Sequence, residues 1–167
     1  MSYRLPTLLA LAMTLAVSGA WAEPNPEQVP GIGSIAPAFG LHSIQRSNKD
    51  VEREATELDS FCGLRPAGTK AVLLVFMNRE SLDGISVMNT LYRKFHKEGL
   101  ELIGLSVDSS PLEVRARLER SSLKFPVLDD SQRIVSTRYG LSGDTFTFLL
   151  NGECRVLGFS SRSLADD

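Results

Sequence analysis

Two almost uninterrupted apolar runs organise the chain. Residues Ala71–Met77 and Leu100–Val107 are aliphatic and β-branched with few polar interruptions, which is typical of strands buried on both faces of a parallel sheet. Between them, apolar residues recur every three or four positions over Ile85–Phe95, which predicts an amphipathic helix. A right-handed crossover through that helix would make the two strands parallel neighbours.

The second half of the chain continues the alternation of strands and helices. Ser110 followed by Pro111 indicates the start of a second helix, because proline is favoured in the first helical turn. The further predicted elements are a short extended piece at Phe125–Leu128, a helix from about Ser131 to Gly140, and two strands at Phe146–Leu150 and Cys154–Phe159 joined by the turn Asn151-Gly152. Upstream, Phe39–Ile44 predicts a short strand and Gln45–Glu57 a charged surface loop. This order predicts an α/β sandwich.

The first residues have the pattern of a cleavable export signal. Arg4 precedes an apolar run at Leu5–Val17, and a small-x-small site ends at Ala22. We therefore expect a signal peptide at residues 1–22, an extended linker at 23–36 that is rich in proline and glycine, and one domain at 37–167. No later run approaches the roughly 20 apolar residues of a membrane span. The predicted location is the periplasm or the exterior of the cell.

Charge and composition narrow the possible ligands. The chain has 18 Lys and Arg against 20 Asp and Glu, a net charge of −2, and no basic cluster, which argues against nucleic-acid binding. It has two histidines and two cysteines, and the cysteines, Cys62 and Cys154, are too far apart in sequence for a Cys-x-x-Cys pair or a metal knuckle. We expect no metal and no cofactor.

Four segments in order resemble one family. They are Gly33–Phe39, Leu100–Asp108, Phe125–Asp129 and Thr145–Leu150 with its Asn151-Gly152 turn. Together they are similar to thioredoxin-like redoxins, the group of alkyl hydroperoxide reductase/thiol-specific antioxidant proteins and TlpA-type thiol–disulfide oxidoreductases. The resemblance implies a thioredoxin-like three-layer sandwich with a mixed central sheet. It also implies a family activity of thiol–disulfide exchange or peroxide reduction.

The redox residues of that family are missing at the matching positions. In TlpA-type relatives a Cys-x-x-Cys follows the first buried strand, where the helix N-terminus lowers the pKa of a thiol. Those two positions fall here on Ser81 and Gly84, and the family's cis-proline position falls on Thr145. A serine hydroxyl cannot exchange disulfides, and Ser81 or Asp83 is expected to cap the helix. The interpretation is a redox-degenerate protein, a pseudoenzyme that acts as a binding or accessory protein.

The two cysteines leave three states open: a structural disulfide, two free buried thiols, or a redox-active pair. An oxidising compartment favours a disulfide. In the resembled fold, Cys62 precedes the first buried strand and Cys154 begins the last strand, so both should lie at the end of the sheet opposite Ser81. This placement favours a structural disulfide. The alternative function is an active thiol–disulfide oxidoreductase that uses Cys62 and Cys154.

Relatives end in a helix that covers the sheet, and here only Ser160–Asp167 follow the last predicted strand. Without that C-terminal helix, we expect an apolar strip beside the Ile85–Phe95 helix and an open edge at the last strand. Exposed apolar strips usually mark contact sites. The strip is covered either by the Gln45–Glu57 loop or the N-terminal linker, or by a protein partner or a second copy in a homodimer.

Overall fold

The computed structural model describes residues 29–45, 55–63, 68–79, 81–142 and 145–161. The predicted signal peptide and the first part of the predicted linker lie outside these residues. So do most of the predicted charged loop and the end of the C-terminal tail. In the described part of the chain, no helix is long and apolar enough to cross a membrane.

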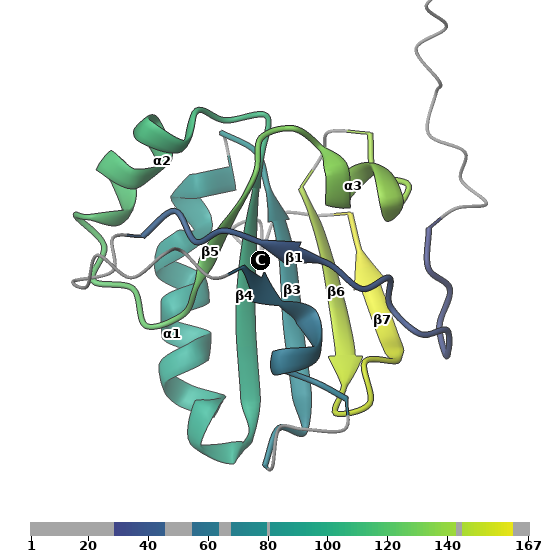
Figure 1. Ribbon diagram of the computed structural model, residues 1–167. Helices are drawn as coiled ribbons and strands as arrows, with labels where there is room; N and C mark the ends of the chain where they lie inside the picture. The colour runs from purple at the N-terminus through teal and green to yellow at the C-terminus, as the bar shows by residue number, and fades with distance from the viewer. Residues whose placement is uncertain (1–28, 46–54, 64–67, 80, 143–144, 162–167) are drawn as a thin grey trace, which may run out of the picture.

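A mixed five-stranded sheet forms the centre of the molecule (Figure 1). Its strands lie in the order β5-β4-β3-β6-β7. β3, β4 and β5 are parallel neighbours, whereas β6 runs antiparallel to both β3 and β7. The strands are β3 at Ala71–Met77, β4 at Leu100–Val107, β5 at Val127–Asp130, β6 at Phe146–Asn151 and β7 at Val156–Ser160. The two apolar runs are therefore adjacent parallel strands, as predicted.

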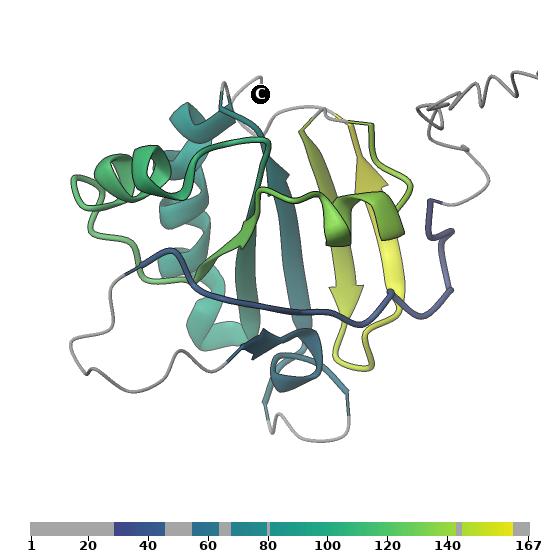
Figure 2. The same cartoon turned by 45° about the horizontal axis from the view of Figure 1, so that its top comes forward.

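In the described residues, three α-helices cover the sheet. α1 (Ile85–Phe95) and α2 (Pro111–Leu118) pack on one face, and α3 (Ile134–Arg138) packs on the other (Figure 2). α1 passes into a short 3₁₀ turn and ends at Gly99, whose φ of +101° favours glycine. The predicted three-layer α/β sandwich is confirmed.

Strand β3 shows why the apolar runs are continuous. Val72, Leu74 and Phe76 belong to the core on the α3 side, whereas Val75 and Met77 belong to the core beneath α1 and α2. Both faces of the strand are thus removed from water. Each buried aliphatic or aromatic side chain contributes about 1.5–3 kcal/mol to the stability of the fold. Polar residues at alternate positions of this strand would therefore destabilise the protein.

Two predicted boundaries are wrong. The extended segment at Phe39–Ile44 contributes only the two-residue strand β1 (Gly40–Leu41), which pairs with β2 (Thr56–Glu57). The turn between β6 and β7 is longer than the two residues predicted, since Asn151 N–H donates to the Arg155 carbonyl and Asn151 Oδ1 accepts the Arg155 N–H. Cys154 lies in this loop with φ of +59° and not in the strand.

The chain segment before β1 lies against the domain. Ile35 forms an antiparallel bridge with Arg155, the residue before β7, and Ala36 is part of the core. Further along, the hydroxyl of Tyr139, which follows α3, donates to the Pro37 carbonyl at 2.9 Å. Residues 33–36, which the sequence assigns to the linker, therefore pair with residues 154–156, where β7 begins.

The described residues contain no helix after β7, and apolar side chains are exposed in this region. Leu149 of β6 pairs with Leu73 of β3, so its side chain points to the α1 face of the sheet. Leu149 is 37% exposed, and Val87 of α1 is 38% exposed. On the β7 margin, Leu157 and Phe159 are each 50% exposed.

Candidate functional site

The connection from β3 to α1 contains the first two of the predicted degenerate positions. After Met77 the chain passes Asn78 and Arg79 and enters a 3₁₀ turn at Ser81–Gly84, which leads directly into α1. The Asn78 Oδ1 accepts the Ser81 N–H at 2.9 Å, and the Ser81 hydroxyl donates to the Asn78 carbonyl at 3.1 Å. Asn78 therefore caps this turn, whereas Ser81 or Asp83 was expected to cap the helix; α1 has Gly84 at its N-cap and no side-chain cap there.

Ser81 is poorly suited to nucleophilic chemistry. Its side chain is largely buried, at 9% exposed, and its hydroxyl proton is used in the hydrogen bond to Asn78. Activation of a serine requires an adjacent base. His96 follows the last residue of α1, at the far end of that helix, and His42 lies beside β5, where its carbonyl accepts the Asp129 N–H.

Thr145, the residue before β6, lies at the same end of the sheet as Ser81. Phe76 of β3 pairs with Phe146 of β6, so Thr145 lies level with Met77, where β3 ends. No cis peptide bond occurs among the described residues. The fold thus gathers Ser81, Gly84 and Thr145 at one end of the sheet.

The two cysteines form a disulfide at the opposite end. The Cα atoms of Cys62 and Cys154 are 5.2 Å apart across 92 positions of sequence. Ala71, the first residue of β3, pairs with Asn151, so the β6–β7 loop that holds Cys154 lies where β3 begins. Cys62 is fully buried and Cys154 is 8% exposed. The predicted disulfide and its distance from Ser81 are confirmed, and no free cysteine remains among the described residues.

A polar network at the start of α3 was not predicted. Asp130 is 1% exposed, and its carboxylate accepts the N–H groups of Val135 and Ser136 at 2.9 and 2.8 Å. Arg133, with φ of +56°, donates to the Asp108 carboxylate and to the Leu141 carbonyl, both at 3.1 Å. The network ties the Leu141 carbonyl, which follows α3, to Arg133 at its start. An aspartate just before a helix was the signal available in the sequence.

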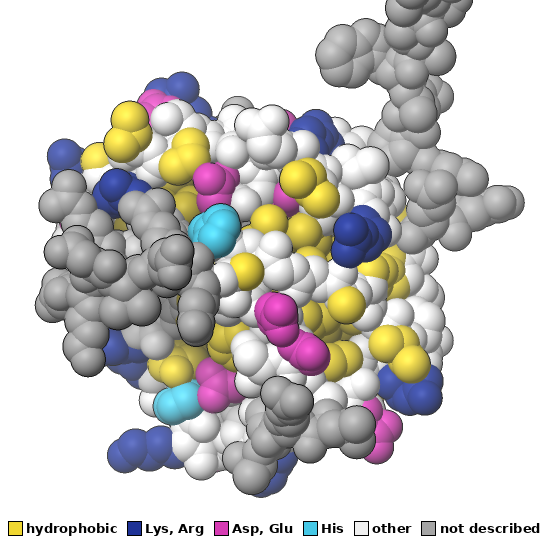
Figure 3. Space-filling view, viewed as in Figure 1, with side chains coloured by type: hydrophobic (Ala, Val, Ile, Leu, Met, Phe, Trp, Pro, Cys, Tyr) yellow, Lys and Arg dark blue, Asp and Glu magenta, His cyan; other side chains and the backbone are white. Residues whose placement is uncertain are grey.

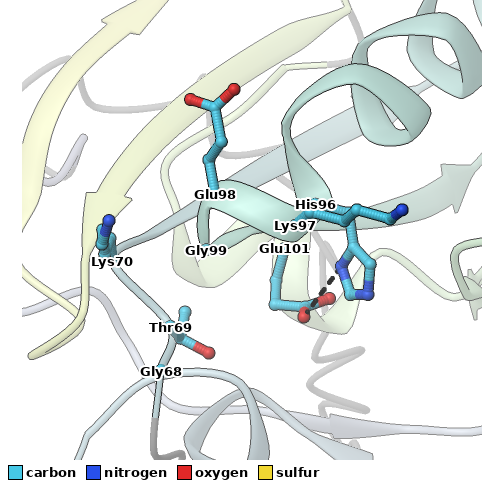
Figure 4. A pocket seen from close by; sticks show the side chains of 8 residues that line it. All are labelled: Gly68, Thr69, Lys70, His96, Lys97, Glu98, Gly99 and Glu101. Atoms are coloured by element: carbon cyan, nitrogen blue, oxygen red, sulfur yellow. Dashed lines mark ion pairs between the residues drawn. The ribbon is translucent and has the colours of Figure 1, made fainter.

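A polar pocket of about 290 Å³ opens where α1 ends and β3 begins (Figure 4). His96 Nδ1 lies 3.2 Å from Glu101 Oε1 on its wall, and the His96 ring stacks on Tyr92 at 4.4 Å between centroids. Burial, and secondarily the charge of Glu101, raise the pKa of Tyr92. The lining residues are Gly68, Thr69, Lys70, His96, Lys97, Glu98, Gly99 and Glu101.

Neither this pocket nor the rest of the described chain offers a metal site. No group of three or more His, Cys, Asp or Glu side chains comes together among the described residues. On the face seen in Figure 3, basic and acidic side chains are interspersed with small groups of apolar ones. Chemically, the molecule offers one buried disulfide and, at the other end, a hydroxyl engaged in a helix-start turn.

Comparison with known proteins gives related sequences. A thiol–disulfide oxidoreductase ResA of Bacillus thuringiensis (strain Al Hakam) is 35% identical over 130 residues, which are 75% of this chain and 67% of that protein. A ResA of Geobacillus kaustophilus is 36% identical over 131 residues, which are 75% of this chain and 68% of that protein. A chloroplastic peroxiredoxin Q of Sedum lineare is 30% identical over 75% of this chain and 62% of that protein.

Solved structures share the fold. A thiol:disulfide interchange protein from a Bacteroides species superposes with a TM-score of 0.62 at 18% identity, over 80% of this chain and 84% of that one. A reduced 2-Cys peroxiredoxin of Plasmodium vivax gives a TM-score of 0.61 at 21% identity, over 79% and 85%. The family model described as the AhpC/TSA family matches residues 32–158. This chain, with its thioredoxin-like sandwich, belongs to the AhpC/TSA family.

Proposed function

We propose that this chain is an exported, redox-degenerate member of its family that works by binding another protein. One observation carries the proposal. The chain has only two cysteines, and both are joined in a buried disulfide remote from the end of β3. The end of β3 presents Ser81 and Gly84, which carry no sulfur. A protein in this state has no thiol where its relatives' chemistry is expected.

The physical basis is the requirement for a thiolate. Disulfide exchange and peroxide reduction both begin with attack by a thiolate, and a serine hydroxyl does not ionise in the same range. A helix N-terminus lowers the pKa of a thiol placed there, but Ser81 lies in the 3₁₀ turn before α1, and the neighbouring Glu80 and Asp83 would raise the pKa of a thiol at this position. Ser81 instead contributes a structural hydrogen bond to Asn78.

A gain-of-function experiment tests the alignment of Ser81 and Gly84 with the family's redox positions, on which the proposal depends. The double variant Ser81→Cys, Gly84→Cys should accelerate insulin reduction by dithiothreitol above the wild-type level. A matched control, Val87→Cys with Thr90→Cys, has the same spacing further along α1 and should leave the rate unchanged. Equal rates for the two double variants would contradict the assignment of Ser81 and Gly84 to the family's redox positions.

The alternative function is thiol–disulfide exchange by Cys62 and Cys154. The relatives named thiol-disulfide oxidoreductases favour it, but the burial of Cys62 and the distance of the pair from the helix start weigh against it. Wild-type turnover that disappears on Cys62→Ser would establish this alternative. Turnover that persists in that variant would contradict both functions.

The binding role is assigned to the β7 margin. No strand pairs with the outer side of residues 157–159 in the described part of the chain, and Leu157 and Phe159 are each half exposed. An open edge with apolar side chains is a template for another chain. Light scattering should show a homodimer or a complex, and the Leu157→Glu variant should be dissociated into monomers. A monomer in both cases, with no protein captured from a periplasmic extract, would contradict the binding role.

Export is part of the proposal. Residues 1–22 have the pattern of a signal peptide, and a buried disulfide is the form that cysteines take in an oxidising compartment. Mass spectrometry of the protein recovered from the periplasm should give a chain that begins at Glu23. Recovery of the uncut chain from the cytoplasm alone would contradict export.

A further inference from the structure

The turn between β6 and β7 brings together the groups of one covalent reaction within the chain. The asparagines of the sequence are Asn25, Asn48, Asn78, Asn89 and Asn151. Only Asn151 is followed by glycine, and the pair lies at the end of the sheet where β3 begins (Figure 1). The backbone nitrogen of the next residue can attack the side-chain Cγ of an asparagine, and a glycine there adds no side chain to hinder the approach.

The nucleophile of that reaction is free. The Gly152 N–H donates to no group in the described part of the chain, although the Gly152 carbonyl accepts the Gly63 N–H at 2.7 Å. Gly152 is partly exposed, so solvent hydroxide can remove its proton. A side chain is excluded at this position, because a Cβ would meet the Thr69 carbonyl oxygen at 2.7 Å. The fold therefore requires the one residue type that leaves the nitrogen open to reaction.

The carbonyl that would be attacked is polarised by two donors. Asn151 Oδ1 accepts the N–H groups of Glu153 and Arg155, both at 2.9 Å. Attack on Cγ moves negative charge onto this oxygen, and backbone N–H groups aimed at a developing oxyanion lower the barrier of such a step. Among the described residues, nothing accepts a hydrogen bond from Asn151 Nδ2, so the nitrogen that must leave is unhindered.

We infer that Asn151 is a self-modification site, at which the chain deamidates without an enzyme. The Gly152 nitrogen loses its proton and forms a bond to Asn151 Cγ. The bond from Cγ to Nδ2 breaks, and Nδ2 takes up a proton and leaves as ammonia, so that a cyclic succinimide remains. Water then opens the ring and leaves aspartate or isoaspartate at position 151, with one added negative charge. This reaction is independent of the proposed binding role.

The two products affect the turn differently. Aspartate keeps an oxygen in the place of Asn151 Oδ1, so it still accepts the Glu153 and Arg155 N–H groups, and an ionised acceptor makes the stronger hydrogen bond. Isoaspartate inserts a methylene into the backbone, which displaces the Gly152 carbonyl from the Gly63 N–H. The Asn151→Asp variant should therefore unfold at the same urea concentration as the wild type, and the isolated isoaspartate form at a lower one. The reverse order would contradict this account of the turn.

Incubation of the folded, disulfide-bonded protein at mildly alkaline pH, followed by peptide mapping with mass spectrometry, tests the site. Asn151 should gain the mass of an acid in place of an amide. Asn78, which accepts one N–H and precedes an arginine, is the internal control and should stay unmodified. A synthetic peptide of residues 148–156 gives the rate without the fold, and the folded protein should react at least as fast. A slower reaction in the folded protein, or equal modification of Asn78, would overturn the inference.

A matched pair of variants tests the polarising N–H groups. Glu153→Pro removes the N–H that points at Asn151 Oδ1, whereas Glu153→Ala keeps it, and both lose the same side chain, which is 78% exposed. The proline variant should react at least about tenfold more slowly than the alanine variant, since one such donor contributes that much or more. Equal rates would contradict the role given to the turn. If the proline variant does not fold, the comparison of the wild type with the peptide decides.

Discussion

Reduction of the Cys62–Cys154 disulfide should cost the fold a measurable part of its stability. The bond closes a loop across 92 positions, for which the chain-entropy relation gives a stabilisation of about 4.5 kcal/mol at 25 °C. Measured stabilisations by disulfides are typically about 2–4 kcal/mol, below this entropic value. The expected loss in unfolding free energy is therefore about 3 kcal/mol.

Urea unfolding of the oxidised and the reduced protein measures this difference. With a slope of about 2 kcal/mol per molar urea, the midpoint should fall by about 1.5 M on reduction. Reduced protein is preferred to serine variants because both sulfur atoms stay in the core and no packing volume is lost. Far-UV circular dichroism and tyrosine fluorescence should give coincident transitions, as two-state unfolding requires. A fall below about 0.5 M, which corresponds to about 1 kcal/mol, would refute the entropic reasoning.

Three further predictions concern single residues. Asp130→Ala should lower the unfolding free energy by about 1–2 kcal/mol in a urea titration, because the Val135 and Ser136 N–H groups in the first turn of α3 lose their acceptor; an unchanged midpoint would contradict this role. Gly99→Ala should cost at least about 2 kcal/mol by the same measurement, since φ is +101° and a Cβ would meet the Gly68 carbonyl oxygen at 2.7 Å; a cost under about 0.5 kcal/mol would contradict it. Burial raises the pKa of Tyr139, so above about pH 10 the unfolded state loses its proton first. Thermal stability should therefore fall as the pH rises from 9 to 11, and Tyr139→Phe should reduce that slope; equal slopes would contradict the assignment.

The central strands and the disulfide were predictable from sequence for different reasons. Both faces of β3 and β4 are buried, so these strands must be apolar throughout. The two apolar runs in the sequence are therefore enough to locate them. The disulfide was one of three states that the sequence left open, and it was favoured because the signal-like pattern indicates an oxidising compartment and the resembled fold places both cysteines at one end of the sheet. The first inference needs the local sequence alone, whereas the second needs the topology of the resembled fold.

The elements that were missed depend on tertiary context. Asn151-Gly152 indicates a two-residue turn, but the hairpin opens further, with Cys154 tied to Cys62 and Asn151 closing the loop onto Arg155. Arg133 adopts a left-handed conformation and reaches Asp108, which is 25 positions away. The Arg133 conformation is stabilised by a residue remote in the chain, which nothing local marks. The hairpin turn is closed locally by Asn151, and only its bond to Cys62 is remote.

The measurement that tests the central claim most directly is the wild-type rate of insulin reduction by dithiothreitol. The central claim is that the end of β3 carries no thiol chemistry in this chain. A thiol–disulfide oxidoreductase ResA of Bacillus thuringiensis, one of its relatives, serves as the positive control under the same conditions. The account predicts a rate equal to that of dithiothreitol alone. A rate within about tenfold of that control, equivalent to about 1.4 kcal/mol in activation free energy, would contradict it.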